Sequence, residues 1–244
     1  MGKIIAVASG KGGTGKTTVV AAISSCLAVL GFRTLCIDFD AELRNLDLSL
    51  GMTDFTVIDY MDVVDGRKSL ADACSEAPKI PNLFFLSAPT SRDVKVDTYA
   101  LRDMFNEIRS SFDYCLIDSP SGIGQGFNLA HSNADMSIIV TTGEFASIRD
   151  AHRTANAVRE LGIKNLRLLV NRVLPKNFKH IRTTIDDVID TVGVQLLGLI
   201  PEGIIIFRAM HEGTPLILYK KRVSAYDFLD AARRITGEDL PLHR

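Results

Sequence analysis

The stretch that most constrains the fold of this chain is the glycine-rich run from Gly10 to Thr18. It fits the phosphate-loop pattern G-x-x-x-x-G-K-[ST], with Gly10 and Gly15 as the spaced glycines, then Lys16 and Thr17. Glycines let backbone N–H groups approach phosphate oxygens without a Cβ in the way, and the following helix points its positive dipole end at the same phosphates. The pattern predicts that Lys16 reaches the β- and γ-phosphates and that Thr17 binds Mg²⁺.

The flanking residues distinguish a phosphate loop from a glycine-rich turn that matches by chance. Lys3 to Ser9 is a short apolar run suited to a buried strand, and Val19 to Leu30 is a helical pattern closed by Gly31. Strand, loop and helix is the arrangement that the motif requires. We therefore predict a nucleotide-phosphate site formed by Gly10, Lys11, Gly12, Gly13, Thr14, Gly15, Lys16, Thr17 and Thr18.

Length and composition fit a single domain over residues 1–244, because 244 residues with 46% hydrophobic content can bury one α/β core. A net charge of -1 gives no electrostatic case for bulk nucleic-acid binding. The four cysteines form no C-x-x-C pair, which favours buried thiols in a reducing cytosol. No signal peptide or membrane-spanning stretch is present, so we expect a cytoplasmic protein, with the inner face of the cell membrane as an alternative location.

Apolar strand patterns alternate with helical patterns along the chain, which predicts a mostly parallel sheet with helices on both faces. The predicted strands after the first are 33–38, 82–88, 113–118, 136–142, 166–171 and 196–200. The predicted helices after the first are 98–110, 147–161, 181–191 and 225–235.

Acidic residues end two of these strands. Asp38 and Asp40 follow the second strand, and Asp118 ends a later one. Because ligands collect at the carboxyl ends of parallel strands, we favour metal-site roles for these acids over the alternative that they cap the following turns.

Several segments together carry a resemblance to a known family. Lys11 stands in the phosphate loop where an ordinary loop has no fixed residue. The other segments are 38–47, 57–66, 118–127, 149–153, 171–172 and 200–202. Over essentially the whole chain the sequence resembles the MinD/ParA ATPases, which carry a deviant Walker A motif, and within them the MinD branch.

The resemblance implies an ATPase that forms a homodimer on binding ATP, with Mg²⁺ as cofactor and ADP as product. It implies that Lys11 reaches the partner subunit's phosphates, so that Lys11 and Lys16 both act in catalysis. Asp40 would position the attacking water, and Thr17, Asp38 and Asp118 would hold Mg²⁺, the two aspartates through water. Asn171, Arg172, Pro201 and Glu202 would lie around the adenine.

The function implied most directly is a spatial regulator of cell division, with a division inhibitor and an ATPase activator as protein partners. The alternative is a ParA-type ATPase that partitions DNA or cargo, although no specific nucleic acid is expected from the charge balance. A metal-cofactor maturation ATPase is less favoured because no suitable cysteine pair is present.

Departures from the family pattern concern partner contacts more than nucleotide binding. They include Ser121, Gly124, Gly143 and Gly203. After Arg234, Gly237 and Pro241 interrupt the helical pattern where a basic amphipathic membrane helix is expected. If the chain is complete, we expect it not to sediment with liposomes, even with ATP.

Overall fold

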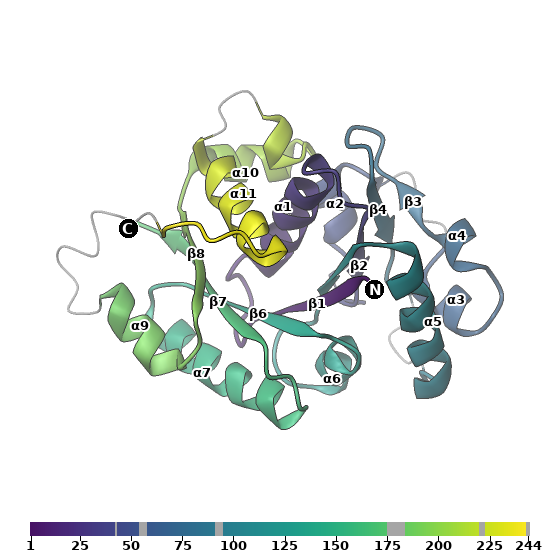
Figure 1. The fold of residues 1–244 in the computed structure, drawn as a ribbon, viewed down its shortest axis with the longest axis horizontal. Coiled ribbons are helices and arrows are strands. Elements are labelled where there is room, and N and C mark those ends of the chain that lie inside the picture. Colours follow the sequence, from purple (N-terminus) through teal and green to yellow (C-terminus); the bar gives the residue numbers. More distant parts are fainter. Residues whose placement is uncertain (42, 54–57, 91–94, 175–183, 220–222, 243–244) are drawn as a thin grey trace.

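The computed structural model describes residues 1–41, 43–53, 58–90, 95–174, 184–219 and 223–242 (Figure 1). The described residues build a single α/β domain around an eight-stranded sheet in the order β3-β4-β2-β5-β1-β6-β7-β8. All neighbouring strands are parallel except β3, which pairs antiparallel with β4 at one edge. The strands are β1 Lys3–Ala8, β2 Thr34–Asp38, β3 Ser75–Glu76, β4 Leu83–Leu86, β5 Tyr114–Asp118, β6 Met136–Thr141, β7 Leu166–Val173 and β8 Leu196–Pro201.

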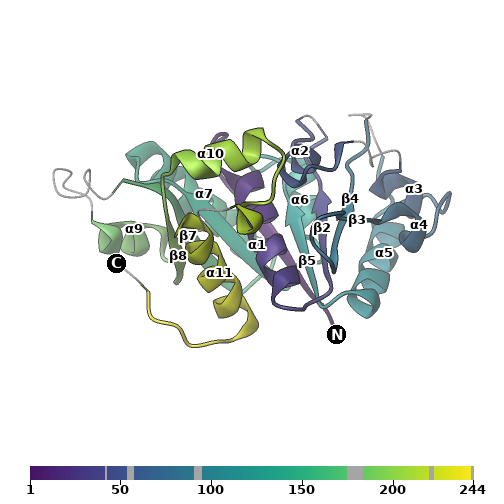
Figure 2. The same cartoon turned by 90° about the horizontal axis from the view of Figure 1, so that it is seen from above.

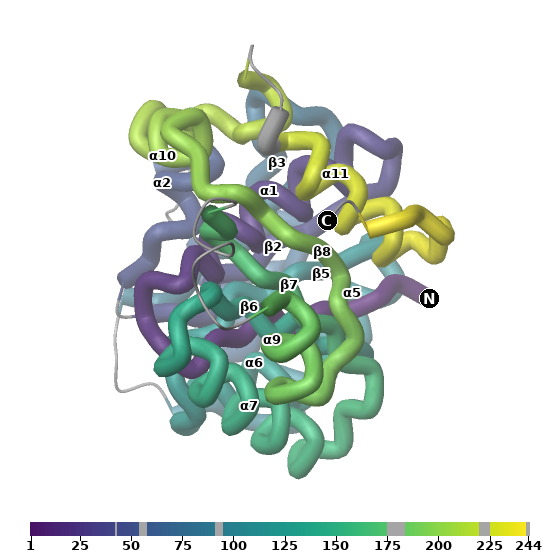
Figure 3. Tube along the Cα trace, turned by 90° about the vertical axis from the view of Figure 1, so that its left-hand side faces the viewer, coloured from purple at the N-terminus to yellow at the C-terminus, as the bar shows by residue number. Residues whose placement is uncertain are grey.

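Helices cover both faces of the sheet (Figures 1 and 3). One face carries α1 Lys16–Val29, α2 Leu46–Leu50, α10 Ile204–His211, the short 3₁₀ helix Leu216–Leu218 and α11 Val223–Thr236. The other face carries α3 Tyr60–Val64, α4 Leu70–Ala73 and α5 Thr98–Ser111 towards β4, and α6 Gln125–His131, α7 Phe145–Glu160 and α9 Ile185–Val192 towards β8.

Strand β1 shows why this sequence forms a two-sided core. Ile5 and Val7 belong to the cluster under α1, whereas Ile4 and Ala6 point to the opposite face and pack in the cluster under α5. Successive side chains of a strand alternate between faces, so a strand covered on both sides must be apolar throughout. Helix α1 is likewise buried along most of its length because it lies between the sheet and α11.

The predicted strands and the predicted fold are confirmed, with shifted boundaries. Helix α1 begins at Lys16, directly after the loop, rather than at Val19. The predicted helix start at Ile181 lies outside the described residues, as does Val57, and the described helix α9 begins at Ile185. The short elements α2, α3, α4, β3, α6 and α10 were not predicted.

Two sequence expectations concern thiols and membranes. Cys26, Cys36 and Cys115 are buried, and Cys74 is partly buried. No helix in the described part of the chain has the length and apolar character needed to cross a membrane.

The candidate site lies at the carboxyl ends of the strands. In Figure 2 the N-terminus lies at the bottom, whereas α2 and α10 lie along the top. The loop from β1 to α1 and the residues after β2 and β5 meet at the carboxyl ends of the strands, which is where parallel α/β sheets hold ligands.

Candidate nucleotide-binding site

The loop between β1 and α1 has the conformation that its glycines allow. Gly15 adopts φ +90°, in the left-handed region, and a Cβ there would lie 2.3 Å from Nδ2 of Asn171. A Cβ on Gly10 would lie 2.6 Å from the carbonyl oxygen of Asp150, so α7 packs directly on the loop. Both positions therefore need glycine, because any side chain would displace the loop from its neighbours.

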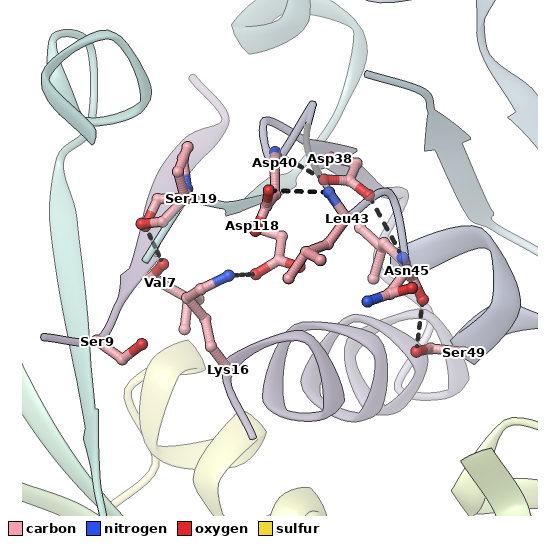
Figure 4. A network of polar contacts seen from close by, with 12 residues as sticks. Val7, Ser9, Lys16, Asp38, Asp40, Leu43, Asn45, Ser49, Asp118 and Ser119 are labelled. Carbon is pink, nitrogen blue, oxygen red and sulfur yellow. Dashed lines mark hydrogen bonds and ion pairs between the residues drawn. The ribbon is translucent and has the colours of Figure 1, made fainter. Parts of the chain in front are cut away.

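Lys16 points inward and forms an ion pair with Asp118 at the end of β5 (Figure 4). Its Nζ lies 2.5 Å from Oδ1 of Asp118, and the two side chains are 6% and 1% exposed. Burial raises the pKa of Asp118, while Lys16 and the Thr17 hydroxyl oppose that rise. The first turn of α1 therefore faces the carboxylate at the end of β5.

Asp38 stands beside Asp118, because the two residues are paired in the register of β2 and β5. Its carboxylate accepts hydrogen bonds from the backbone N–H groups of Asp40 at 2.8 Å and Leu46 at 3.3 Å. Burial, and then the nearby charge of Asp118, raise the pKa of Asp38 to about 7. Two buried carboxylates at paired positions of adjacent strands favour a cation between them.

Asp40 lies in the turn that leads from β2 to α2 and is 8% exposed. Its Oδ1 accepts a hydrogen bond from the Leu43 N–H at 3.2 Å, and its carbonyl oxygen accepts one from the Arg44 N–H at 3.0 Å. Figure 4 shows Lys16 pointing to Asp118, with Asp38 and Asp40 near Asp118. The structure thus brings the three strand-end acids together.

Lys11 differs from Lys16 in its surroundings. Its Nζ lies 3.2 Å from Oε2 of Glu144, at the start of α7, and the two side chains are 49% and 70% exposed. The loop therefore presents one lysine to the interior and another to the surface.

Two neighbouring hollows adjoin the loop and share Arg172 and Glu202. A cavity of about 440 Å³ is lined by residues 11–14, residues 142–144, Ser147 and Leu174. A second one of about 430 Å³ is lined by Gly15, Thr18, Asn171, Pro201, Gly203 and three residues of α10, Ile206, Phe207 and Met210. The residues expected around the adenine thus form a wall of one hollow beside the phosphate loop.

Asn171 has a further contact that the sequence did not indicate. Its Nδ2 donates a hydrogen bond to the carbonyl oxygen of Thr14 at 2.8 Å and so ties the end of β7 to the loop. The next residue, Arg172, adopts φ 55°, which is uncommon for a residue other than glycine. The bend at Arg172 lies where both hollows meet.

The chemistry of the site fits a nucleotide with Mg²⁺. The Thr14 hydroxyl oxygen is buried in the loop and has no hydrogen-bond partner among the described residues. Within those residues, no group of three or more His, Cys, Asp or Glu side chains could hold a metal alone. Mg²⁺ commonly uses one or two protein oxygens together with waters and phosphate oxygens, so Thr17, Asp38 and Asp118 are a suitable set.

Two contacts of the site join residues far apart in the sequence and were missed. Glu144, whose carboxylate reaches Lys11, is not among the predicted site residues. Ser87, just after β4, accepts a hydrogen bond from Arg44 at 2.9 Å. No motif spacing signals either pair.

Comparison with known proteins gives a consistent result. Residues 5–216 match the model of the CobQ/CobB/MinD/ParA nucleotide binding domain. The chain is 37% identical to the septum site-determining protein MinD of Bacillus subtilis over 246 residues, covering 99% of this chain and 92% of that protein.

Two solved structures are similar over nearly their full lengths. The MinC:MinD cell division protein complex of Aquifex aeolicus contains a chain matched with a TM-score of 0.93 and 36% identity, covering 99% of this chain and 98% of that one. The septum site-determining protein MinD of Pyrococcus horikoshii, complexed with Mg-ADP, matches with a TM-score of 0.85 and 29% identity, covering 97% of both chains.

Proposed function

Because the chain belongs to the MinD/ParA family of P-loop ATPases, we propose that it is a septum site-determining switch of the MinD type, which ATP converts from monomer to homodimer. The whole of residues 1–244 acts as one ATPase domain in this proposal. The observation that carries it is the different placement of the two loop lysines, Lys16 buried and Lys11 half exposed.

The phosphates of the nucleotide bind in the loop. The backbone N–H groups from Gly10 to Thr18 and the N-terminus of α1 supply partial positive charge, and Lys16 supplies a full one. To reach the phosphates, Lys16 exchanges part of its contact with Asp118 for phosphate oxygens. Buried cationic groups of this kind stabilise the charge that develops in phosphoryl transfer.

Thr17 would ligate Mg²⁺ directly, and Asp38 and Asp118 would hold its waters. The ion would neutralise negative charge on the β- and γ-phosphates. The carboxylates lie in register at adjacent strand ends, so little rearrangement is needed to orient the waters. Asp40, held in the next turn, would accept a hydrogen bond from the attacking water.

The adenine would lie in the hollow lined by Asn171, Arg172, Pro201 and Glu202. That hollow opens beside Gly15 and Thr18, so a base seated there leaves its phosphates directed at the loop. The base edge would hydrogen-bond to groups of these residues, and Ile206, Phe207 and Met210 of α10 would supply an apolar wall.

Lys11 would contact the phosphates of the nucleotide bound to the other subunit. Its present partner, Glu144, is exposed, and exposed ion pairs contribute little free energy, so Lys11 can change partner at low cost. A triphosphate between two such loops would then hold two identical subunits together. Hydrolysis removes the γ-phosphate contacts and reverses the association.

The Aquifex aeolicus complex shows a MinD chain bound to MinC, and we propose a protein partner of that kind for this chain as well. A division inhibitor would bind the dimer, and an activating protein would stimulate hydrolysis. These partners would couple the nucleotide cycle to the position of the septum.

The test is the molecular mass measured by light scattering after size exclusion. With Mg²⁺ and ATP, the Asp40→Ala protein, which should retain ATP, is expected to run as a dimer, and with ADP or no nucleotide as a monomer. Adding Lys11→Ala should abolish the dimer while ADP affinity stays within about twofold of wild type. Lys3→Ala is the matched lysine control, because Lys3 lies at the amino end of β1, away from the site.

Four results would contradict parts of the proposal. No uptake of adenine nucleotide by calorimetry would remove the nucleotide site altogether. Normal ATP-dependent dimers of the Lys11→Ala protein would remove the shared site. A salt-sensitive mobility shift of DNA that requires ATP would favour DNA partitioning. Expression in a MinD-depleted Bacillus subtilis strain that leaves the septa misplaced would count against the division role.

A further inference from the structure

We propose that Ser87 and the stacked rings of Phe39 and Tyr60 form a clamp that positions Asp40, so that they set the rate of hydrolysis without touching the nucleotide. This inference rests on the role of Asp40 in the proposed function. Ser87 directly follows β4, Tyr60 begins α3 and Phe39 directly follows β2, so the clamp lies outside the phosphate loop and its motif.

The first arm of the clamp is Phe39, which stands between the two acids Asp38 and Asp40. Its ring is 3% exposed and stacks on Tyr60, with ring centroids 4.4 Å apart and planes 8° apart. Its other neighbour is Phe105 of α5, at 6.1 Å. Phe39 thus anchors the segment from the face of the sheet that α3 and α5 cover, opposite to α1 (Figure 1).

The backbone at Phe39 is fixed as well. Its N–H donates a hydrogen bond to the carbonyl oxygen of Asp118 at 2.9 Å, which continues the pairing of β2 with β5 by one residue. A rotation at residue 39 would therefore break the ring stack and a buried hydrogen bond together. Aromatic stacking and a satisfied buried N–H each favour one orientation.

The second arm reaches Asp40 from its other side through Arg44. Arg44 adopts φ 44°, in the left-handed region, and its Nη2 donates a hydrogen bond to Oγ of Ser87 at 2.9 Å. The N–H of Arg44 donates to the carbonyl oxygen of Asp40, so the side-chain contact with Ser87 also holds the turn that carries Asp40.

Both arms converge on Ser87. Its carbonyl oxygen accepts a hydrogen bond from the Tyr60 N–H at 3.0 Å, while its Oγ accepts the one from Arg44. Ser87 is 3% exposed and directly follows β4, which pairs with β2. Ser87 therefore holds both Tyr60, whose ring stacks on Phe39, and the side chain of Arg44, which is bonded through its N–H to Asp40.

This arrangement matters because the carboxylate of Asp40 must meet a water molecule in line with the γ-phosphate. A displacement of about 1 Å in such a group can reduce the rate of a reaction about a hundredfold, while substrate binding through other contacts is retained. Loosening the clamp should therefore lower kcat much more than it weakens nucleotide binding.

The experiment compares Tyr60→Leu, which removes the stack, with Ser87→Ala, which removes the Arg44 contact. Each variant is expected to lower kcat for Mg-ATP hydrolysis about tenfold, with ADP affinity within about twofold of wild type. Tyr60→Phe keeps the ring and is expected to restore kcat. Arg44→Ala combined with Ser87→Ala should lower kcat no further than either change alone, because the two residues act through one contact.

Phe112→Leu is the matched control, because Phe112 also contacts another ring, Phe84 edge to face at 5.4 Å, but lies at the amino end of β5, at the opposite ends of the strands from the site. It should lower thermal stability without changing kcat. Wild-type kcat in folded Tyr60→Leu and Ser87→Ala proteins would overturn the clamp, as would an equal loss of kcat and ADP affinity. A wild-type rate for Asp40→Ala would instead overturn the proposed role of Asp40.

Discussion

Asp38 and Asp118 occupy directly paired positions at the ends of β2 and β5, and each side chain is 1% exposed. Among the described residues, Lys16 forms an ion pair with Asp118 and not with Asp38. Burial and the charge of Asp118 together raise the pKa of Asp38 to about 7. The pair is therefore arranged for a cation, and it is unfavourable when both groups are ionised without one.

Asp38→Asn should stabilise the nucleotide-free protein at pH 8 by roughly 1–3 kcal/mol, because it removes one of two buried like charges. The same change should weaken Mg²⁺-dependent hydrolysis. Urea unfolding without Mg²⁺ measures the first effect and steady-state ATPase assays the second. Asp103→Asn, on the exposed face of α5, is the control, and a less stable Asp38→Asn protein would contradict the expectation.

His131 should make the protein less stable in mild acid. Its Nδ1 donates to the carbonyl oxygen of Phe127 at 2.8 Å and its Nε2 lies 3.2 Å from Oγ of Ser137, which fixes a neutral tautomer. Burial lowers the pKa of His131 from 6.5 to about 4. Since the unfolded state binds the proton first, the stability that His131 contributes is lost as pH falls from about 6.5 towards 4, by about 3 kcal/mol.

The measurement is the free energy of unfolding across that pH range for wild type and His131→Leu. The difference between the two should shrink or reverse towards pH 4, because leucine does not titrate. His152→Gln, on the exposed side of α7, controls for general effects of removing a histidine. Parallel curves for wild type and His131→Leu would show that the buried ring is not the titrating group.

Gly15→Ala should lose nucleotide binding and roughly 1–3 kcal/mol of stability, because φ +90° is strained for alanine and its Cβ would meet Asn171. The Gly12→Ala control has no atom within 4 Å of the added Cβ. It should therefore fold with wild-type stability. Thermal unfolding and ADP calorimetry compare them, and a wild-type result for Gly15→Ala would place the loop in another conformation.

The sequence predicted the parts of this fold that depend on local pattern. Continuous apolar runs marked the strands of the sheet, and the residues after them marked its ligand-binding edge. Helices α2 and α10 were not predicted because they are short, and because the packing of α2 against both α1 and α10 depends on the tertiary fold. Strand β3 has two residues, and its antiparallel pairing with β4 has no periodicity to detect.

In the candidate site, too, local sequence pattern predicted some residues and missed others. Lys16, Asp38 and Asp118 stand at positions that motif and strand ends define. The contact of Lys11 with Glu144 joins residues 133 positions apart, and that of Arg44 with Ser87 joins residues 43 apart. Such contacts follow from the order of strands in the sheet, which alternating patterns do not determine.

Lys16→Ala should abolish ATP turnover, but it also leaves Asp118 buried without its ion-pair partner. Breaking a buried pair by removing one side typically costs about 3–5 kcal/mol, so loss of activity alone would not separate catalysis from folding. The double change Lys16→Ala with Asp118→Asn should recover most of that stability, because no unpaired charge remains. It should recover no turnover, because the cation that would contact the phosphates is still missing. Urea unfolding and ATPase assays on Lys16→Ala, Asp118→Asn and the double variant complete this double-mutant cycle. Return of turnover with stability would assign Lys16 a structural role only.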